Sequence, residues 1–309
     1  MTKKIATLVG CAIGDALGNP FEMWKAERQE LVDWNGQFKS GGTFWVGEAG
    51  QYTDDTLMSI ALSKSMLQQG EFDPDDVAAE YLAWYNTGNT RGIGTTTARA
   101  CDRLKQGADY SESGIVMGYD DQPAAGNGTA MRATPIGLVY RNQIDRLMEY
   151  AMLDAMITHN NLEPKMGSIA VALATAYLAN ETHDPVMCLA EIKDIVFDSI
   201  VKEKLELAYA HLVEYRTPPM EALASIGVGG YVPETVGAAF YCLAATTNFK
   251  DAVVLAVKAG GDTDTTAAIV GALAGTYYGL DGIPDEYKEG VENFQLLQDL
   301  TDELINIEL

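Results

Sequence analysis

The stretch GGDTDTTAAIVGALAGTYYG, from Gly260 to Gly279, places two carboxylates and three hydroxyls between a glycine pair and a run of small apolar residues. The run before it, DAVVLAVKA, is typical of a helix that stops at the glycine pair. The small side chains after it predict a helix that can approach its neighbours closely and so suits the centre of a bundle. One Asp or Thr suffices as the N-cap of that helix, so the other polar residues need a different explanation.

The turn YTDDT, from Tyr52 to Thr56, repeats this arrangement far upstream. Its adjacent acids, Asp54 and Asp55, repel each other unless a cation or solvent compensates. A hard divalent cation such as Mg²⁺ or Mn²⁺ prefers several oxygen ligands. Acid pairs are also common helix caps, so either turn alone would be weak evidence. If the two turns meet in space, they predict a shared metal site.

Helical patterns dominate the rest of the chain. Asp73 and Asp184 each precede a proline, as at many helix starts, and Pro233 marks another start. Further helices are predicted at residues 143–157, 165–180, 200–214, 249–259, 265–279 and 291–307. Alternating runs long enough for strands are hard to find. The pattern predicts an all-α fold, with a single domain over residues 1–309.

Composition narrows the classes of partner. The chain has 309 residues, of which 47% are hydrophobic, enough to bury a substantial core. Acidic residues number 44 against 21 basic ones, and the formal charge of −23 argues against duplex nucleic acid or an anionic membrane as a partner. No apolar run approaches the roughly 20 residues of a spanning helix, and the N-terminus is not a convincing signal peptide. We expect a cytoplasmic monomer.

Cysteine and histidine offer no metal pattern. The four cysteines are scattered among apolar or small residues without C-x-x-C spacing, and the three histidines form no H-x-x-x-H pair. We therefore expect buried free thiols, and oxygen ligands for any metal. His159, in ITHNN, follows a predicted helix. It is either an ordinary helix C-cap or a phosphate contact.

Near the N-terminus, GCAIGDALGNPFE runs from Gly10 to Glu22. Asp15 and Glu22 are seven residues apart and could share one side of a pair of helical turns. Pro20 should break the helix, so that Glu22 projects from a loop. The alternative is a solvated glutamate beside a glycine-packed helix.

A glycine-rich loop lies in AAGNGTAMRATPIGL, residues 124–138. Gly126, Asn127 and Gly128 permit unusual backbone conformations, and N–H groups exposed in such a loop can cradle a phosphate. A tight turn before a helix is the alternative explanation. Long irregular segments, which are often functional, are expected at residues 31–52, 86–97 and 119–130.

Taken in order, these segments resemble the ADP-ribosylglycohydrolase family. GCAIGDALGNPFE is similar to the family's N-terminal motif, YTDDT to its first metal motif, GNGTAMR to its substrate loop, THNN to its histidine segment and GGDTDT to its C-terminal metal motif. Each motif alone is weak evidence for the resemblance, but the five motifs in this order are specific to the family. The resemblance implies a compact orthogonal multi-helix bundle around two Mg²⁺ or Mn²⁺ ions. It also implies hydrolysis of the glycosidic bond at the anomeric carbon of an ADP-linked ribose.

The resemblance also implies roles for individual positions. The implied metal ligands are Thr53, Asp54, Asp55, Asp262, Asp264 and Thr265. The implied catalytic residues are Glu22 and Asp55. The implied contacts to ADP-ribose are Gly126, Asn127 and Gly128 at the distal ribose and diphosphate, His159 at the phosphates, and Gly227, Val228 and Gly229 at the adenosine.

Recognition of the adenine and of the acceptor is less defined. The loop before GNG lacks the aromatic residue that some relatives stack on adenine, so Tyr119 and Tyr231 are candidates to replace it. The expected substrate is an ADP-ribosylated protein or small molecule. Arginine is the favoured acceptor, ahead of serine, a nucleic acid base or O-acetyl-ADP-ribose.

For the reaction, we expect the two ions to hold the ribose diol and a water, with Glu22 or Asp55 taking the proton of that water. Two other functions stay open. One is a metal-dependent phosphoester or diphosphate hydrolase, since phosphatases also use carboxylate-bound metal pairs, although the chain has no P-loop. The other is a catalytically silent ADP-ribose-binding or crystallin-like structural protein, against which the intact acidic motifs count.

Overall fold

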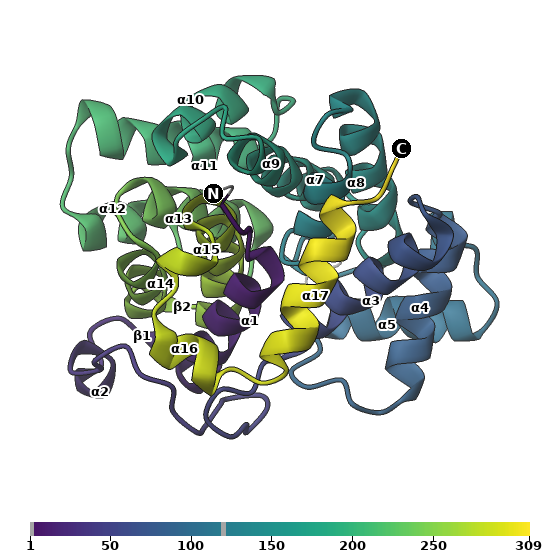
Figure 1. The fold of residues 1–309 in the computed structure, drawn as a ribbon, viewed down its shortest axis with the longest axis horizontal. Helices are drawn as coiled ribbons and strands as arrows, with labels where there is room; N and C mark the ends of the chain where they lie inside the picture. Colours follow the sequence, from purple (N-terminus) through teal and green to yellow (C-terminus); the bar gives the residue numbers. More distant parts are fainter. Residues whose placement is uncertain (1–2, 119–121) are drawn as a thin grey trace.

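The regular structure is almost entirely helical (Figure 1), so the prediction of an all-α fold is confirmed. The computed structural model describes residues 3–118 and 122–309. The helices up to residue 158 are α1 (Thr7–Gly18), α2 (Gln29–Val32), α3 (Asp54–Gln69), α4 (Pro74–Asn86), α5 (Thr95–Lys105), α6 (Tyr110–Ser113), α7 (Thr134–Val139) and α8 (Ile144–Thr158). Those that follow are α9 (Leu162–Ala179), α10 (Pro185–Ile195), α11 (Ile200–Tyr209), α12 (Pro219–Ile226), α13 (Val232–Ala244), α14 (Phe249–Lys258), α15 (Thr263–Tyr278), α16 (Asp285–Gly290) and α17 (Phe294–Ile305). Shorter elements are the 3₁₀ turns η1 (Asn19–Phe21) and η3 (Leu280–Gly282), the π turn η2 (Ala210–Glu214), and the two-residue strands β1 (Trp24–Lys25) and β2 (Gly260–Gly261).

The predicted helices are all present, as α8, α9, α11 with η2, α14, α15 and α17. The predicted N-caps at Asp73 and Asp184 are confirmed, because each carboxylate accepts hydrogen bonds from backbone N–H groups of the helix it precedes. The sequence pattern did not predict α5, α12 or the short helices α2, α6, α7 and α16. The start of α5 falls inside the segment 86–97 that was expected to be irregular, because its first turn is a run of threonines that resembles a loop.

Helices α1 and α15 pack against each other at the centre of the molecule (Figure 1), antiparallel and in close contact. The Thr263 hydroxyl, at the start of α15, donates to the Gly18 carbonyl at the end of α1 over 2.8 Å. A Cβ atom on Gly14 would lie 1.8 Å from the carbonyl oxygen of Ala267. This approach places the start of α15, with its two acids, beside the end of α1 and the segment that carries Glu22.

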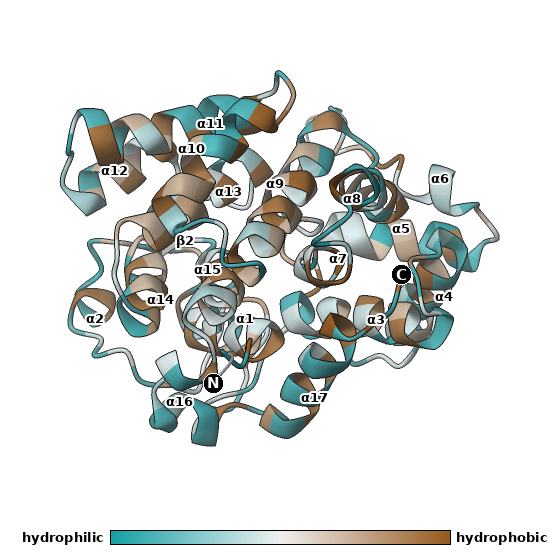
Figure 2. Cartoon of the chain, turned by 45° about the horizontal axis from the view of Figure 1, so that its top comes forward, coloured by the Kyte–Doolittle hydropathy of each residue, from teal (hydrophilic) through white to brown (hydrophobic). Residues whose placement is uncertain are grey.

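One large hydrophobic cluster draws on helices from both halves of the chain. In Figure 2 the central helices α1 and α15 carry mostly white and brown residues, while α4 and α11 at the periphery carry many teal ones. The four cysteines are buried and free, as expected. Within the described ranges, none of the helices combines the length and apolarity needed to cross a membrane.

Candidate active site

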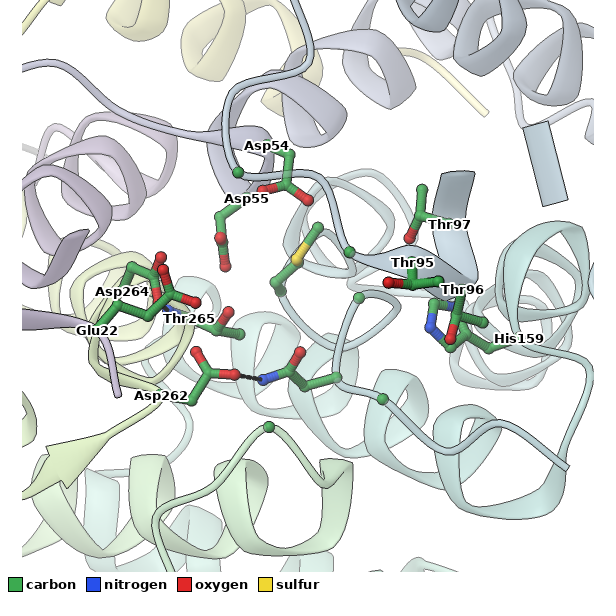
Figure 3. A pocket seen from close by; sticks show the side chains of 17 residues that line it. Glu22, Asp54, Asp55, Thr95, Thr96, Thr97, His159, Asp262, Asp264 and Thr265 are labelled. Carbon is green, nitrogen blue, oxygen red and sulfur yellow. Dashed lines mark hydrogen bonds between the residues drawn. The ribbon is translucent and has the colours of Figure 1, made fainter. Parts of the chain in front are cut away.

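The two acidic turns and Glu22 meet at one cavity (Figure 3). Asp54 and Asp55 lie in the first turn of α3. Asp264 lies in the first turn of α15, and Asp262 is the N-cap residue directly before that helix. Figure 3 shows their carboxylates turned toward a common space. The expectation that these distant turns share one place in the fold is therefore confirmed at the level of geometry.

Glu22 reaches this space through a short strand pair. Residues Trp24 and Lys25 pair antiparallel with the glycines Gly261 and Gly260, and the Met23 N–H donates to the Gly261 carbonyl over 2.6 Å. Both glycines have φ near +72°, a conformation that favours glycine. The glycine pair therefore does more than end α14, because it also ties the Glu22 segment to the acidic turn.

Both acidic turns start a helix without using their side chains as caps. Thr53 and Asp262 are the N-cap residues of α3 and α15, and neither makes a side-chain capping hydrogen bond. Asp73, by contrast, caps α4 with its carboxylate. The side chains of the two N-cap residues thus do not cap, although Asp262 Oδ2 accepts the Asn127 amide and Asp264 Oδ1 accepts the Thr265 N–H.

The oxygen atoms at this site fit a hard divalent cation. One carboxylate oxygen from each of Glu22, Asp262 and Asp264 lies within 4.8 Å of the other two. The Oδ1 atoms of Asp55 and Asp262 are buried and have no hydrogen-bond partner among residues 3–118 and 122–309. Buried carboxylate oxygens without donors are costly unless a cation compensates them, and an all-oxygen set suits Mg²⁺ or Mn²⁺.

The pKa values of these carboxyl groups also reflect the cost of burying several negative charges together. Burial, reinforced by the charge of Asp15, raises the pKa of Asp54 to about 8. Burial, reinforced by Asp262 and Asp54, raises the pKa of Glu22 to about 8. Burial and neighbouring acids also hold the pKa values of Asp55 and Asp264 well above their usual range. Near pH 7, the site therefore needs either protons or cations.

This site makes the stability of the metal-free protein depend on pH. In the unfolded chain these carboxyls regain pKa values near 4, so between about pH 4 and pH 8 the folded state binds more protons and stability falls as pH rises. In EDTA we expect the midpoint of thermal unfolding to drop by several degrees from pH 5 to pH 8, and Mg²⁺ or Mn²⁺ to reverse the drop. Scanning calorimetry measures both; a midpoint insensitive to the cation at pH 8 contradicts the assignment.

Asp15 has a different role from the one suggested by its spacing to Glu22. It lies inside α1, fully buried, and its carboxylate accepts hydrogen bonds from the backbone N–H and hydroxyl groups of Thr53 and Thr56 at 2.7–3.2 Å. Asp15 and Glu22 do not share a pair of helical turns, because α1 ends at Gly18, and Asp15 is absent from the lining of the cavity. Asp15 instead anchors the start of α3.

The predicted metal ligands are placed unequally. Asp54, Asp55, Asp262, Asp264 and Thr265 all line the cavity. Thr53 is fully buried beneath it, and its hydroxyl donates to Asp15 at 2.8 Å and lies 3.1 Å from Asp55 Oδ2. A ligand role for Thr53 stays a prediction.

The glycine-rich loop forms another wall of the cavity. The Asn127 amide donates to Thr235 Oγ1 over 3.0 Å and to Asp262 Oδ2 over 2.9 Å, which joins this loop to the acidic turn. His159, the residue after α8, packs against the loop, because a Cβ atom on Gly128 would lie 2.9 Å from its Cε1 atom. Its ring is buried, and burial with the charge of Arg132 lowers its pKa to about 3.

The loop assigned to adenosine lies behind the acidic turn. Gly227, Val228 and Gly229 are absent from the lining of the cavity, and the Val228 carbonyl accepts the Asp262 N–H over 2.8 Å. Of the next two residues, Gly230 lines both the acidic cavity and a neighbouring one, and Tyr231 lines only the neighbouring one. The adenosine role of the loop stays a prediction. Tyr119, the other candidate for adenine, lies outside the described residues.

Comparison with known proteins decides the family, because the model of the ADP-ribosylglycohydrolase family matches residues 2–308. The chain belongs to this family. It is 29% identical to an ADP-ribosylarginine hydrolase of Pseudomonas putida, covering 97% of this chain and 76% of that protein. It is 28% identical to an ADP-ribosylhydrolase of Xenopus tropicalis, covering 96% and 93%. A solved ADP-ribosylglycohydrolase-related protein complex superposes with a TM-score of 0.80 at 29% identity, covering 98% of this chain and 97% of that one.

In this member of the ADP-ribosylglycohydrolase family, the cavity is also lined by residues that the sequence pattern did not predict. Lining residues of this kind are Gly92, Gly94, Thr95, Thr96, Thr97, Met131 and Gly230. Most of them lie at the end of the segment 86–97, which was flagged only as long and glycine-rich. Gly92 has φ +78°, and a Cβ atom there would lie 3.2 Å from Asp54 Oδ1. In the sequence this part of the site appears only as Gly92-Ile93-Gly94 followed by threonines, and such a pattern is too common to identify a site.

Two larger cavities share lining residues with the acidic cavity of this ADP-ribosylglycohydrolase. The acidic cavity measures about 200 Å³, less than the roughly 300 Å³ at the lower end of ligand pockets. A cavity of about 660 Å³ shares Glu22 with it and is lined by Phe44 and Trp45. Another, of about 680 Å³, shares Gly126 with it and is lined by Tyr231. A ligand longer than one sugar can therefore extend from the acids in either direction.

Proposed function

We propose that this chain hydrolyses the glycosidic bond between ADP-ribose and an acceptor, with arginine as the favoured acceptor, and releases ADP-ribose. The observation that carries the proposal is the cluster of buried carboxylates in a sugar-sized cavity that shares wall residues with two larger ones. Family membership supports the reaction, and the similarity to the ADP-ribosylarginine hydrolase of Pseudomonas putida supports the acceptor.

The three cavities accommodate the three parts of such a substrate. The distal ribose occupies the acidic cavity, where Asn127 and Glu22 stand close to it. The diphosphate and adenosine extend past Gly126 toward Tyr231. The acceptor leaves on the side of Phe44, in the other cavity that Glu22 lines. A guanidinium acceptor also suits a protein of net charge −23, whose field attracts cations.

Two Mg²⁺ or Mn²⁺ ions held by Asp54, Asp55, Asp262, Asp264 and Thr265 would supply charge neutralisation and Lewis acidity at the ribose. The chain's own groups do the rest. Asn127 and the glycine-rich loop orient the sugar, and the small cavity limits the water present. Glu22 or Asp55 accepts a proton from water as the water oxygen bonds to the anomeric carbon and the carbon–nitrogen bond breaks. That proton then passes to the departing guanidine nitrogen.

The test is product analysis with a panel of substrates. Arginine-, serine- and DNA-linked ADP-ribose are incubated with the protein in Mg²⁺ or Mn²⁺, and the products are separated by chromatography. Free ADP-ribose from the arginine-linked substrate supports the proposal. AMP or phosphate would identify a phosphoester or diphosphate hydrolase instead. ADP-ribose binding without turnover of any substrate would identify a silent binding protein.

Tyr231 provides a test of the adenosine placement. Its side chain is 37% exposed, and its backbone pairs with Gly126 at the junction of two cavities. Stacking of a base on an aromatic ring contributes roughly 1–3 kcal/mol, so Tyr231→Ala should weaken ADP-ribose binding by about tenfold, measured by calorimetry in Mg²⁺. Tyr231→Phe should bind like the wild type, and ribose 5-phosphate should not distinguish the variants. Unchanged ADP-ribose affinity in Tyr231→Ala would place the adenine elsewhere.

A further inference from the structure

A buried network of hydrogen bonds lies directly behind His159. Arg132, from the segment after the glycine-rich loop, and Thr158, the last residue of α8, are both fully buried. Arg132 forms an ion pair with Asp154 in which Nε lies 3.0 Å from Oδ2. Tyr81 donates to the same carboxylate over 2.6 Å. The guanidinium is therefore fixed in place by groups that solvent does not reach.

From this position Arg132 holds two parts of the candidate active site. Its Nη1 donates to the Gly128 carbonyl over 2.7 Å, and its Nη2 donates to Thr158 Oγ1 over 2.9 Å. Thr158 Oγ1 in turn lies 2.9 Å from His159 Nδ1. A continuous chain of contacts thus runs from the arginine through the threonine to the histidine ring.

The directions of these hydrogen bonds follow from the chemistry of the groups. A guanidinium can only donate, so the Thr158 oxygen accepts from Arg132. The Thr158 hydroxyl proton remains, and the described structure gives it one acceptor, His159 Nδ1. If Nδ1 carried its own proton, the hydroxyl proton would stay unpaired in a buried site, which costs about 1–3 kcal/mol. Nδ1 therefore accepts, and in a neutral ring the proton lies on Nε2.

We infer that Arg132 and Thr158 are positioning residues that hold His159 as the neutral tautomer with its proton on Nε2, so that this nitrogen donates a hydrogen bond to an anionic oxygen of the ligand. Nε2 faces the glycine-rich loop, because a Cβ atom on Gly126 would lie 3.3 Å from it. Gly126 lines both the acidic cavity and the one that contains Tyr231. The identity of the anionic group as a diphosphate rests on the proposed function; the tautomer does not.

The surroundings of the ring agree with a neutral donor. Burial and the nearby Arg132 charge lower the pKa of His159 to about 3, so the imidazolium does not form near pH 7. A neutral Nε2–H donates one hydrogen bond without placing a second positive charge next to the buried guanidinium. The arrangement differs from a cationic histidine that attracts phosphate by charge.

Nitrogen NMR of the ¹⁵N-histidine-labelled protein at pH 7 tests the tautomer without any substrate. The chain has three histidines, and His159→Gln identifies the relevant signals. We expect a protonated Nε2 and an unprotonated Nδ1 in the wild type and in Thr158→Ser, which keeps the hydroxyl. In Thr158→Val, a mixture of both tautomers is expected. A wild-type ring protonated on Nδ1, or on both nitrogens, overturns the inference, and this measurement decides even if Thr158→Val does not fold.

Calorimetry with ADP-ribose in Mg²⁺ then tests whether the Nε2–H group of His159 donates a hydrogen bond to the ligand. We expect Thr158→Val to bind at least about tenfold more weakly than Thr158→Ser, since hydrogen bonds to charged groups contribute about 1.5–3 kcal/mol. Equal affinities, with the tautomer lost in Thr158→Val, would overturn the donor role. If the wild type shows the Nε2 tautomer but does not bind ADP-ribose, the tautomer stands and the proposed function fails.

Discussion

Replacing Asp264 by asparagine is expected to abolish hydrolysis of the arginine-linked substrate and to remove tight binding of Mn²⁺. The carboxylate belongs to the set of oxygens within 4.8 Å of one another at the acidic cavity. Its Oδ1 also accepts the Thr265 N–H over 3.0 Å, and an asparagine oxygen can keep that bond. The substitution therefore removes charge while it preserves the first turn of α15. We expect turnover to fall by at least about 10³-fold, near the upper end for a single electrostatic group.

The measurements are initial rates and Mn²⁺ titration calorimetry. Asp198→Asn is the matched control, because it also removes an aspartate charge but lies on the surface, where its side chain is fully exposed. That variant should match the wild type in both assays. Because Asp264 is a buried acid among acids, Asp264→Asn should also be more stable than the wild type in EDTA at pH 8. Full activity of the wild type in EDTA would refute the metal role altogether.

Replacing Gly14 by alanine is expected to produce the largest loss of stability. The added methyl group would lie 1.8 Å from the Ala267 carbonyl oxygen, so the backbones of α1 and α15 must separate. Alanine favours a helix over glycine by about 1 kcal/mol, but overpacking against a rigid backbone costs about 1–3 kcal/mol or more. We expect the overpacking to prevail and to lower the midpoint of thermal unfolding by at least about 4 °C, measured by scanning calorimetry.

Gly94→Ala serves as the control for this prediction. A Cβ atom on Gly94 would meet no atom of the described residues within 4 Å, its own chain neighbours aside, and the φ of −68° at Gly94 is open to alanine. Its stability should remain within about 1 kcal/mol of the wild type. If Gly14→Ala were as stable as Gly94→Ala, then α1 and α15 would not need their close approach, and the joining of the two acidic turns would require another cause.

Local patterns predicted most of the helices and singled out the acidic turns that line the cavity. Prolines after Asp73 and Asp184 marked helix starts because such residues act within one turn of chain. Short runs of threonines and glycines were harder to interpret, and α5 was missed for that reason. The acids of YTDDT and GGDTDT stood out because they exceed what helix capping requires, and in the structure the N-cap residues Thr53 and Asp262 make no side-chain capping hydrogen bond.

Contacts between distant residues could not be predicted in the same way. Asp15 was paired with Glu22 on spacing alone, whereas its real partners, Thr53 and Thr56, lie far along the chain. The network that joins Arg132 to Thr158 also depends on how separate segments pack. Hydrogen bonds of this kind depend on how distant segments are placed relative to each other, which local sequence patterns do not specify.

The sequence by itself determined the helical character of this protein, its oxygen-rich acidic turns and its family. These properties depend on residue type and short spacing, which act through the local backbone. Only the tertiary structure decided that the turns face one cavity, that Glu22 joins them through two glycines, and that Asp15 supports them from beneath. The physical reason is that helix packing sets these distances: glycines let α1 and α15 approach until the start of one meets the end of the other.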